Sequence, residues 1–107
     1  MSGFDERERA QETKYQLDQE QEFKAHARRA KLVGLWAAEQ MGLSKEEGEA
    51  YAKTVILADL EEAGEDDIFR KIRKDLDDKK VAQTDHQIRA RMSELLETAR
   101  LQVKEGR

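Results

Sequence analysis

The sequence predicts an all-α protein, a four-helix bundle preceded by a charged, helix-prone N-terminal segment. The 107 residues include no proline and only 6 glycines, which argues against a fold of strands and turns. Glu, Lys, Arg, Gln, Ala and Leu are enriched, and these residues favour helices. Apolar side chains recur at spacings of three and four along four stretches of the chain. The length favours a single domain with a modest core.

The first predicted helix begins at Phe23 and ends near Met41, where Gly42 can adopt the left-handed conformation that commonly ends a helix. One broad apolar face is expected to pack in the core. Its members are Phe23, Ala27, Ala30, Val33 or Leu35, and Ala37 or Ala38, with Leu32 and Trp36 alongside. We expect Trp36 to be a core residue rather than a platform on which a ligand stacks.

The second predicted helix begins at Ser44, because Glu47 lies three residues later and the two residues form a capping-box pattern. Gly48 near its beginning costs up to about 1 kcal/mol relative to alanine, so the first turn is expected to be weak. Gly64 marks its expected end. The side chains expected on its buried face are Tyr51, Ala52, Val55, Ile56, Leu57 and Leu60.

Two further helices complete the predicted bundle. The third is short and opens with acids at residues 65–67, which favour the positive N-terminal end of a helix. Residues 77–83 lose the helical period, and the fourth helix begins at Thr84 with a second capping-box pattern to Gln87. The apolar stripes are Ile68, Phe69, Ile72 and Leu76, and then Ile88, Met92, Leu95, Leu96, Ala99 and Val103. The short connections favour antiparallel neighbours.

Residues 1–18 are expected to form a segment of their own, ahead of a bundle made by residues 19–107. The segment has helix-forming residues but few apolar side chains that could join a core. Acid–base pairs four residues apart, such as Asp5 with Arg9, add only about 0.2–0.5 kcal/mol each. This is too little to hold an isolated helix firmly against the cost of nucleation. We therefore expect the segment to be mobile in the free protein.

The residue types indicate a binding or regulatory protein rather than an enzyme. The sequence contains no glycine-rich phosphate loop, no zinc motif around His26 or His86, and no set of nucleophile, base and orienting residue. The acids at residues 65–67 lack the spacing of a calcium-binding loop, and there is no cysteine. We expect no metal site and no required cofactor.

Charge and hydropathy limit the partners and the compartment. The net charge of −4 argues against a general nucleic-acid binder, which usually carries a basic surface. The first residues lack the apolar stretch of a signal peptide, and the most apolar run, residues 32–38, is too short to span a bilayer. We expect a soluble, intracellular protein that does not insert into a membrane.

Four basic residues in the first predicted helix, Lys24, Arg28, Arg29 and Lys31, are the most ligand-like cluster in the sequence. The simpler interpretation is a solvated helix face. The alternative is that these side chains bind an acidic partner or the phosphates of ATP or ADP. No sequence motif decides between the two interpretations.

Four stretches resemble one known family. They are "FDERERA" at residues 4–10, "FKAHARRAKLVGLWAAEQMGLS" at 23–44, "YAKTVILADLEEAGEDDIFRKIRKDL" at 51–76 and "TDHQIRARM" at 84–92. Together they are similar to the zeta subunit, the ATPase inhibitor of alphaproteobacterial F-type ATP synthases, over nearly the whole chain. Thr84 stands where the family pattern suggests serine, and both residues cap helices.

The resemblance implies a four-helix bundle whose N-terminal stretch inhibits the enzyme. That stretch, about residues 2–17 here, would become helical as it wedges between an alpha and a beta subunit, near gamma, and blocks rotation in the direction of ATP hydrolysis. The implied partner-binding residues are Phe4, Asp5, Glu6, Arg7, Glu8, Arg9, Ala10, Lys14, Tyr15 and Leu17. Phe4 and Tyr15 are eleven residues apart, on one side of a helix, and are the expected anchors.

The same resemblance carries expectations about the state of the protein in the cell. The free protein would be a cytoplasmic monomer, and it would associate peripherally with the ATP synthase of the inner membrane. An alternative is a regulatory helical bundle that binds adenine nucleotide weakly.

Overall fold

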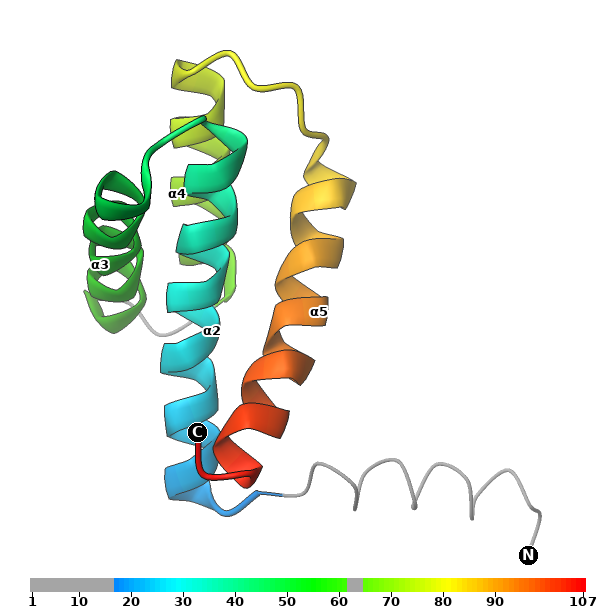
Figure 1. Ribbon diagram of the computed structural model, residues 1–107. Helices are drawn as coiled ribbons and strands as arrows, with labels where there is room; N and C mark the ends of the chain where they lie inside the picture. The colour runs from blue at the N-terminus through cyan, green and yellow to red at the C-terminus, as the bar shows by residue number, and fades with distance from the viewer. Residues whose placement is uncertain (1–16, 62–64) are drawn as a thin grey trace, which may run out of the picture.

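The computed structural model describes residues 17–61 and 65–107, and this part of the chain folds into four helices (Figure 1). They are α2 (Gln19–Gln40), α3 (Lys45–Glu61), α4 (Glu65–Asp78) and α5 (Asp85–Lys104). The predicted all-α, four-helix fold is therefore confirmed. The expected mobile segment lies almost wholly outside the described residues. Within the described ranges, no helix is long and apolar enough to cross a membrane.

Helix α2 occupies the centre of the bundle. It contacts each of the other three helices, and α4 also contacts α3 and α5. In the part of the chain that the structure describes, α3 and α5 do not contact each other, because they lie on opposite sides of α2 (Figure 1). The N-terminal half of α2 and the C-terminal half of α5 continue side by side past the ends of α3 and α4 (Figure 1). One end of the molecule is therefore covered by fewer helices than the other.

Small residues bring α2 and α3 close together. A Cβ atom placed on Gly34 would lie 2.7 Å from the backbone Cα of Ala52, and 3.1 Å from its Cβ. The 2.7 Å distance to a backbone atom is one that real Cβ atoms essentially never show, so any residue larger than glycine would push the two helices apart at this crossing. Gly48 in α3 is buried as well, and its Cβ would meet that of Ala38 at 3.3 Å. The glycine that weakens the first turn of α3 thus permits close packing.

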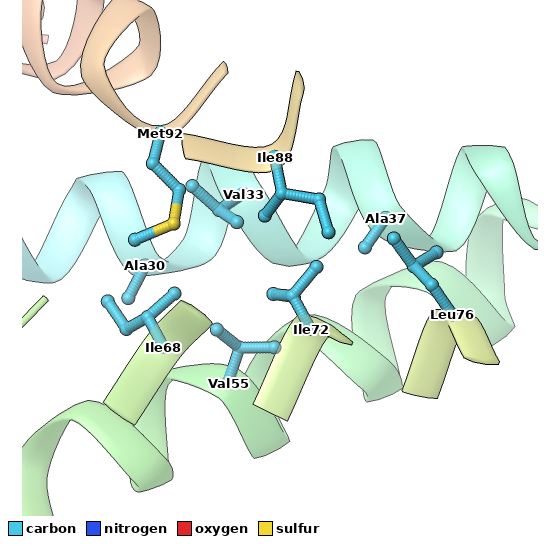
Figure 2. Packing of buried hydrophobic residues seen from close by; sticks show 9 residues of the cluster. All are labelled: Ala30, Val33, Ala37, Val55, Ile68, Ile72, Leu76, Ile88 and Met92. Atoms are coloured by element: carbon cyan, nitrogen blue, oxygen red, sulfur yellow. The ribbon is translucent and has the colours of Figure 1, made fainter. Parts of the chain in front are cut away.

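All four helices contribute to one apolar core (Figure 2). The fully buried members of this cluster are Ala30, Val33, Ala37, Val55, Ile68, Ile72, Leu76, Ile88 and Met92. Burying a large aliphatic side chain contributes about 1.5–3 kcal/mol, so these contacts dominate the stability of the bundle. Trp36 packs against the cluster and is partly buried, in agreement with its predicted role.

The helix starts follow local side-chain chemistry. Ser44 and Thr84 form the predicted capping boxes with Glu47 and Gln87. Gly42 adopts the expected left-handed conformation after α2, with φ 74°. Helix α2, however, begins at Gln19 rather than at Phe23, because Asp18 caps it.

The cap at Asp18 is a full capping box. Its Oδ1 accepts a hydrogen bond from the Gln21 backbone N–H at 2.7 Å, and Gln21 Oε1 accepts from the Asp18 N–H at 3.2 Å. The Asp18 backbone itself is extended, with φ −74° and ψ 176°. The polar pattern D-x-x-Q carries this information in the sequence, but it lies before the apolar period begins.

The connection between α4 and α5 is shorter than predicted, because α4 includes Asp77 and Asp78. Lys80 then takes a left-handed conformation, with φ 58°. Arg73 holds the connection in place: its Nη1 donates to the Gln83 backbone oxygen at 2.6 Å and to Asp85 Oδ1 at 3.0 Å. Helix α4 therefore continues to Asp78, and the left-handed residue Lys80 then turns the chain toward α5.

Three large apolar side chains that were predicted to be buried are exposed, so the prediction is wrong for them. Phe23 is 67% exposed, Leu57 is 59% exposed and Leu60 is 60% exposed. Helix α3 buries Ala52 and Val55 against its neighbours, and Leu57 and Leu60 lie away from that narrow contact. Phe23 lies near the beginning of α2, five residues after the cap at Asp18.

The substitution Gly34→Ala is expected to destabilise the bundle by about 1–3 kcal/mol, because the new methyl group must push the α3 backbone away. Urea unfolding followed by circular dichroism measures this change. Gly48→Ala is the matched control, with a smaller expected effect because its nearest neighbour is a side-chain atom. The contact would be contradicted if Gly34→Ala stabilised the protein as helix propensity alone would.

Candidate functional site

The predicted partner-binding residues lie almost entirely before the described part of the chain. Leu17 is the only member of that set that the structure describes, and it is half-buried ahead of α2. The capping box at Asp18 follows at once. Because the Asp18 backbone is extended and its side chain caps the first turn, the first described helix of the bundle starts at this residue.

The predicted basic cluster separates into two environments. Lys24, Arg28 and Lys31 lie together and, with Arg107 from the C-terminus, line a hollow of about 560 Å³. The Lys24 Nζ lies 3.4 Å from Glu20 Oε1, with both side chains exposed. Three of the four predicted cations therefore share one accessible, positively charged surface.

Arg29 is not part of that surface. Its side chain is only 3% exposed, and its Nη1 lies 3.0 Å from Glu65 Oε1 at the start of α4. Within the described residues its Nε is buried without a hydrogen-bond partner. A buried guanidinium needs a counter-charge, so Arg29 joins α2 to α4 as a structural ion pair.

A second, larger hollow of about 760 Å³ lies beside the N-terminal turns of α2, the last turn of α3 and the first residue of α4. We call it the Phe23–Leu60 groove. Its lining residues are Gln19, Glu22, Phe23, His26, Ala27, Arg29, Asp59, Leu60, Glu65 and Leu96. Sequence reasoning missed the groove, because its members come from four helices. The sequence offered one indication: Phe23 is the first apolar residue of its predicted face and Leu60 is the last of its own, so both lie at helix ends where covering neighbours are fewer.

Most charges in the groove are paired. Glu22 accepts hydrogen bonds from Arg100 of α5, at 3.0 Å from Nε and 3.3 Å from Nη2. His26 Nε2 lies 3.4 Å from Glu22 Oε2. Glu65 is the partner of Arg29. These contacts connect α2 to α5 and α4 around the groove.

Asp59 is the exception among the described side chains, because none of them forms a hydrogen bond or an ion pair with it. Burial raises the pKa of Asp59 above its usual value, and the charge of Asp67 on α4 raises it further. The positive charge of Arg29 and of protonated His26, both on α2, acts in the opposite direction. Asp59 is therefore a partly buried carboxylate that has no direct hydrogen bond or ion pair among the described residues, although the charges of Arg29 and His26 act on it from a distance.

The remaining polar clusters are structural. Tyr51 Oη donates to Asp75 Oδ2 at 2.7 Å, and burial together with this hydrogen bond raises the pKa of Tyr51. Lys71 Nζ reaches the same carboxylate at 3.1 Å. In the described ranges, no group of three or more His, Asp or Glu side chains is arranged to hold a metal ion. The Tyr51–Asp75 hydrogen bond therefore joins α3 to α4, and Lys71 supports it from within α4.

The substitution Asp59→Asn is expected to raise the melting temperature at about pH 7. The raised pKa means that the folded protein favours the protonated form of Asp59. The free energy of unfolding of the wild type therefore falls as the pH rises and Asp59 ionises. The advantage of Asp59→Asn should therefore shrink as the pH falls through the raised pKa of Asp59, where the wild-type carboxylate becomes protonated. Thermal unfolding at neutral and at acidic pH measures the difference.

Glu49→Gln is the matched control, because Glu49 is exposed on the same helix. It should change stability by less than about 0.5 kcal/mol. An Asp59→Asn protein that is less stable than wild type at neutral pH would contradict the assignment.

Comparison with known proteins agrees with this architecture. A structure described as "Solution NMR structure of the protein" is 45% identical to this chain and superposes with a TM-score of 0.69. The match covers 79% of this chain and 96% of the other. A search of curated proteins found no match. The sequence model of the family described as ATPase inhibitor subunit zeta matches residues 1–102, so this chain belongs to the ATPase inhibitor subunit zeta family.

Proposed function

We propose that this protein inhibits F-type ATP synthase by inserting residues 2–17 into the catalytic head, between an alpha and a beta subunit and close to gamma. The inserted segment blocks rotation in the direction of ATP hydrolysis. The observation that carries the proposal is the capping box at Asp18, because it starts the bundle immediately after this segment. Membership of the inhibitor family supports the target.

The composition of the segment suits a region that orders when it binds. It contains Phe4 and Tyr15 as large side chains, and few other apolar residues. A segment that folds on binding loses conformational entropy at that moment, so a few anchors must supply most of the affinity. The charges at residues 5–9 set register and steer association rather than supply bulk affinity.

The bundle has a different role in this mechanism. Its helices pack around a closed core, so it stays outside the head and holds the segment at the entrance. The protein acts as a regulatory subunit on the cytoplasmic side of the inner membrane, as a monomer when free, without catalytic chemistry or a required cofactor.

Deletion of residues 1–17 is expected to abolish inhibition of ATP hydrolysis while leaving the bundle intact. The measurement is the rate of ATP hydrolysis by the matching ATP synthase head as each protein is added. Circular dichroism and thermal unfolding of the shortened protein provide the structural control. Full inhibition by the shortened protein would disprove the role of the segment.

Two single substitutions refine this test. Phe4→Ala and Tyr15→Ala should each weaken inhibition by about tenfold or more, since a hot-spot anchor contributes about 2 kcal/mol or more. Glu8→Gln is the control for the charged positions and should change the potency less. Unchanged potency of both alanine variants would remove these residues as anchors.

A second proposed function is weak binding of ATP or ADP to the bundle. The observation that favours it is the hollow lined by Lys24, Arg28, Lys31 and Arg107, where several cations surround a space of about 560 Å³. Clustered cations bind phosphate groups through charge-assisted hydrogen bonds. Arg29 is excluded from this role, because it is buried against Glu65.

Titration with ATP should produce saturable amide shifts at Lys24, Arg28 and Lys31. Lys31→Ala should weaken the binding several-fold, because an exposed lysine that contacts phosphate contributes about 1 kcal/mol or more. Lys53→Ala, an exposed cation on α3, is the matched control and should leave the binding unchanged. Shifts that do not saturate, or that ignore Lys31→Ala, would contradict nucleotide binding at this hollow.

A further inference from the structure

We propose that the Phe23–Leu60 groove is the surface by which the bundle seats on the catalytic head of the ATP synthase. Its occupant is a surface segment of the head that presents an apolar side chain next to a lysine or arginine. This inference rests on the proposed function and adds a second contact, on the bundle, to that of the N-terminal segment.

The first argument is position. The groove begins at Gln19, the first residue of α2, and Leu17 directly precedes the cap at Asp18. When the preceding segment enters the head, the surface around the entrance must come close to Gln19. The groove includes this residue together with the exposed side chains of Phe23 and Leu60.

The second argument is exposed apolar surface. The large apolar side chains that the described part of the chain exposes are Phe23, Leu57 and Leu60. Two of these three line the groove, and the partly buried Leu96 extends the apolar lining toward α5. Apolar side chains gathered in a hollow and rimmed by polar groups mark an interaction site, whereas a single exposed leucine does not.

The third argument is charge. The groove contains three carboxylates, from Glu22, Asp59 and Glu65, against one guanidinium. Arg100 pairs with Glu22 from outside the groove and Arg29 pairs with Glu65. Asp59 has no direct partner among the described residues, and burial still raises its pKa although the charges of Arg29 and His26 oppose that shift. A basic side chain that enters the groove finds a partly buried carboxylate, where attraction between charges is stronger than in bulk water. The occupant is therefore basic as well as apolar.

The chain supplies a matched pair of substitutions for the test. Leu60→Glu places a charge inside the groove, and Leu57→Glu places the same charge on the same helix at nearly the same exposure, outside the residues that line it. Neither substitution removes a buried contact. In the ATP hydrolysis assay with the full chain, Leu60→Glu should raise the concentration needed for half-inhibition by about tenfold. Leu57→Glu should stay within about twofold of wild type.

Asp59→Asn separates docking from folding. This variant is expected to stabilise the free protein and yet to weaken inhibition several-fold, since it removes the charge that receives the basic side chain. A folding defect cannot produce this combination. Suppose that Asp59→Asn and Leu60→Glu both inhibit as strongly as wild type, while deletion of residues 1–17 still abolishes inhibition. That result would overturn the groove as the docking surface and leave the proposed function intact. Failure of the wild-type chain to inhibit would overturn both.

Crosslinking identifies the occupant directly. The chain contains no cysteine, so Leu60→Cys and Leu57→Cys each give one attachment point for a photo-crosslinker. The expected result is an adduct between position 60 and an alpha or beta subunit of the head, with little at position 57. An adduct of position 60 with residues 1–16 of its own chain, or with a second copy of the protein, would overturn the proposal.

Discussion

The close approach of α2 and α3 at Gly34 determines much of the bundle. Because the backbone of Ala52 occupies the space that a Cβ atom at Gly34 would need, α3 must lie directly on α2 at this point. This contact, together with that of Gly48 against Ala38 one helical turn away, sets α3 in place and allows Val55 to reach the shared core. Helices α4 and α5 then pack on the remaining sides of the central helix.

The same arrangement explains the uncovered end of the molecule. Helices α3 and α4 meet α2 only along part of its length, so the N-terminal turns of α2 pair mainly with α5 (Figure 1). Ion pairs between helices hold this end together, among them that of Arg29 with Glu65 and that of Arg100 with Glu22. Phe23 and Leu60 stay exposed beside them, and Asp59 lacks a partner among the described residues. An end that is stabilised by charges while it leaves apolar side chains exposed has the features of a binding surface.

A regulatory role gives these features a common physical reason. A partly buried carboxylate without a direct partner reduces the stability of the free protein, and apolar side chains that stay exposed contribute little to it. Proteins commonly have such unfavourable features at their binding sites, because the partner supplies the missing contacts in the complex. The N-terminal segment follows the same logic in the proposed mechanism, since its affinity comes from a surface that belongs to another protein.

The sequence by itself determined the helices, the caps at Ser44 and Thr84, the turn at Gly42 and the core stripes of the last two helices, because each depends on residues within a few positions of one another. The tertiary structure decided which candidates are buried. Phe23, Leu57 and Leu60 fit the helical period but lack a covering neighbour, and Arg29 left the basic cluster because Glu65 approaches from α4. Spacing within a helix defines a face, whereas the length and crossing of the packed helices decide what covers it.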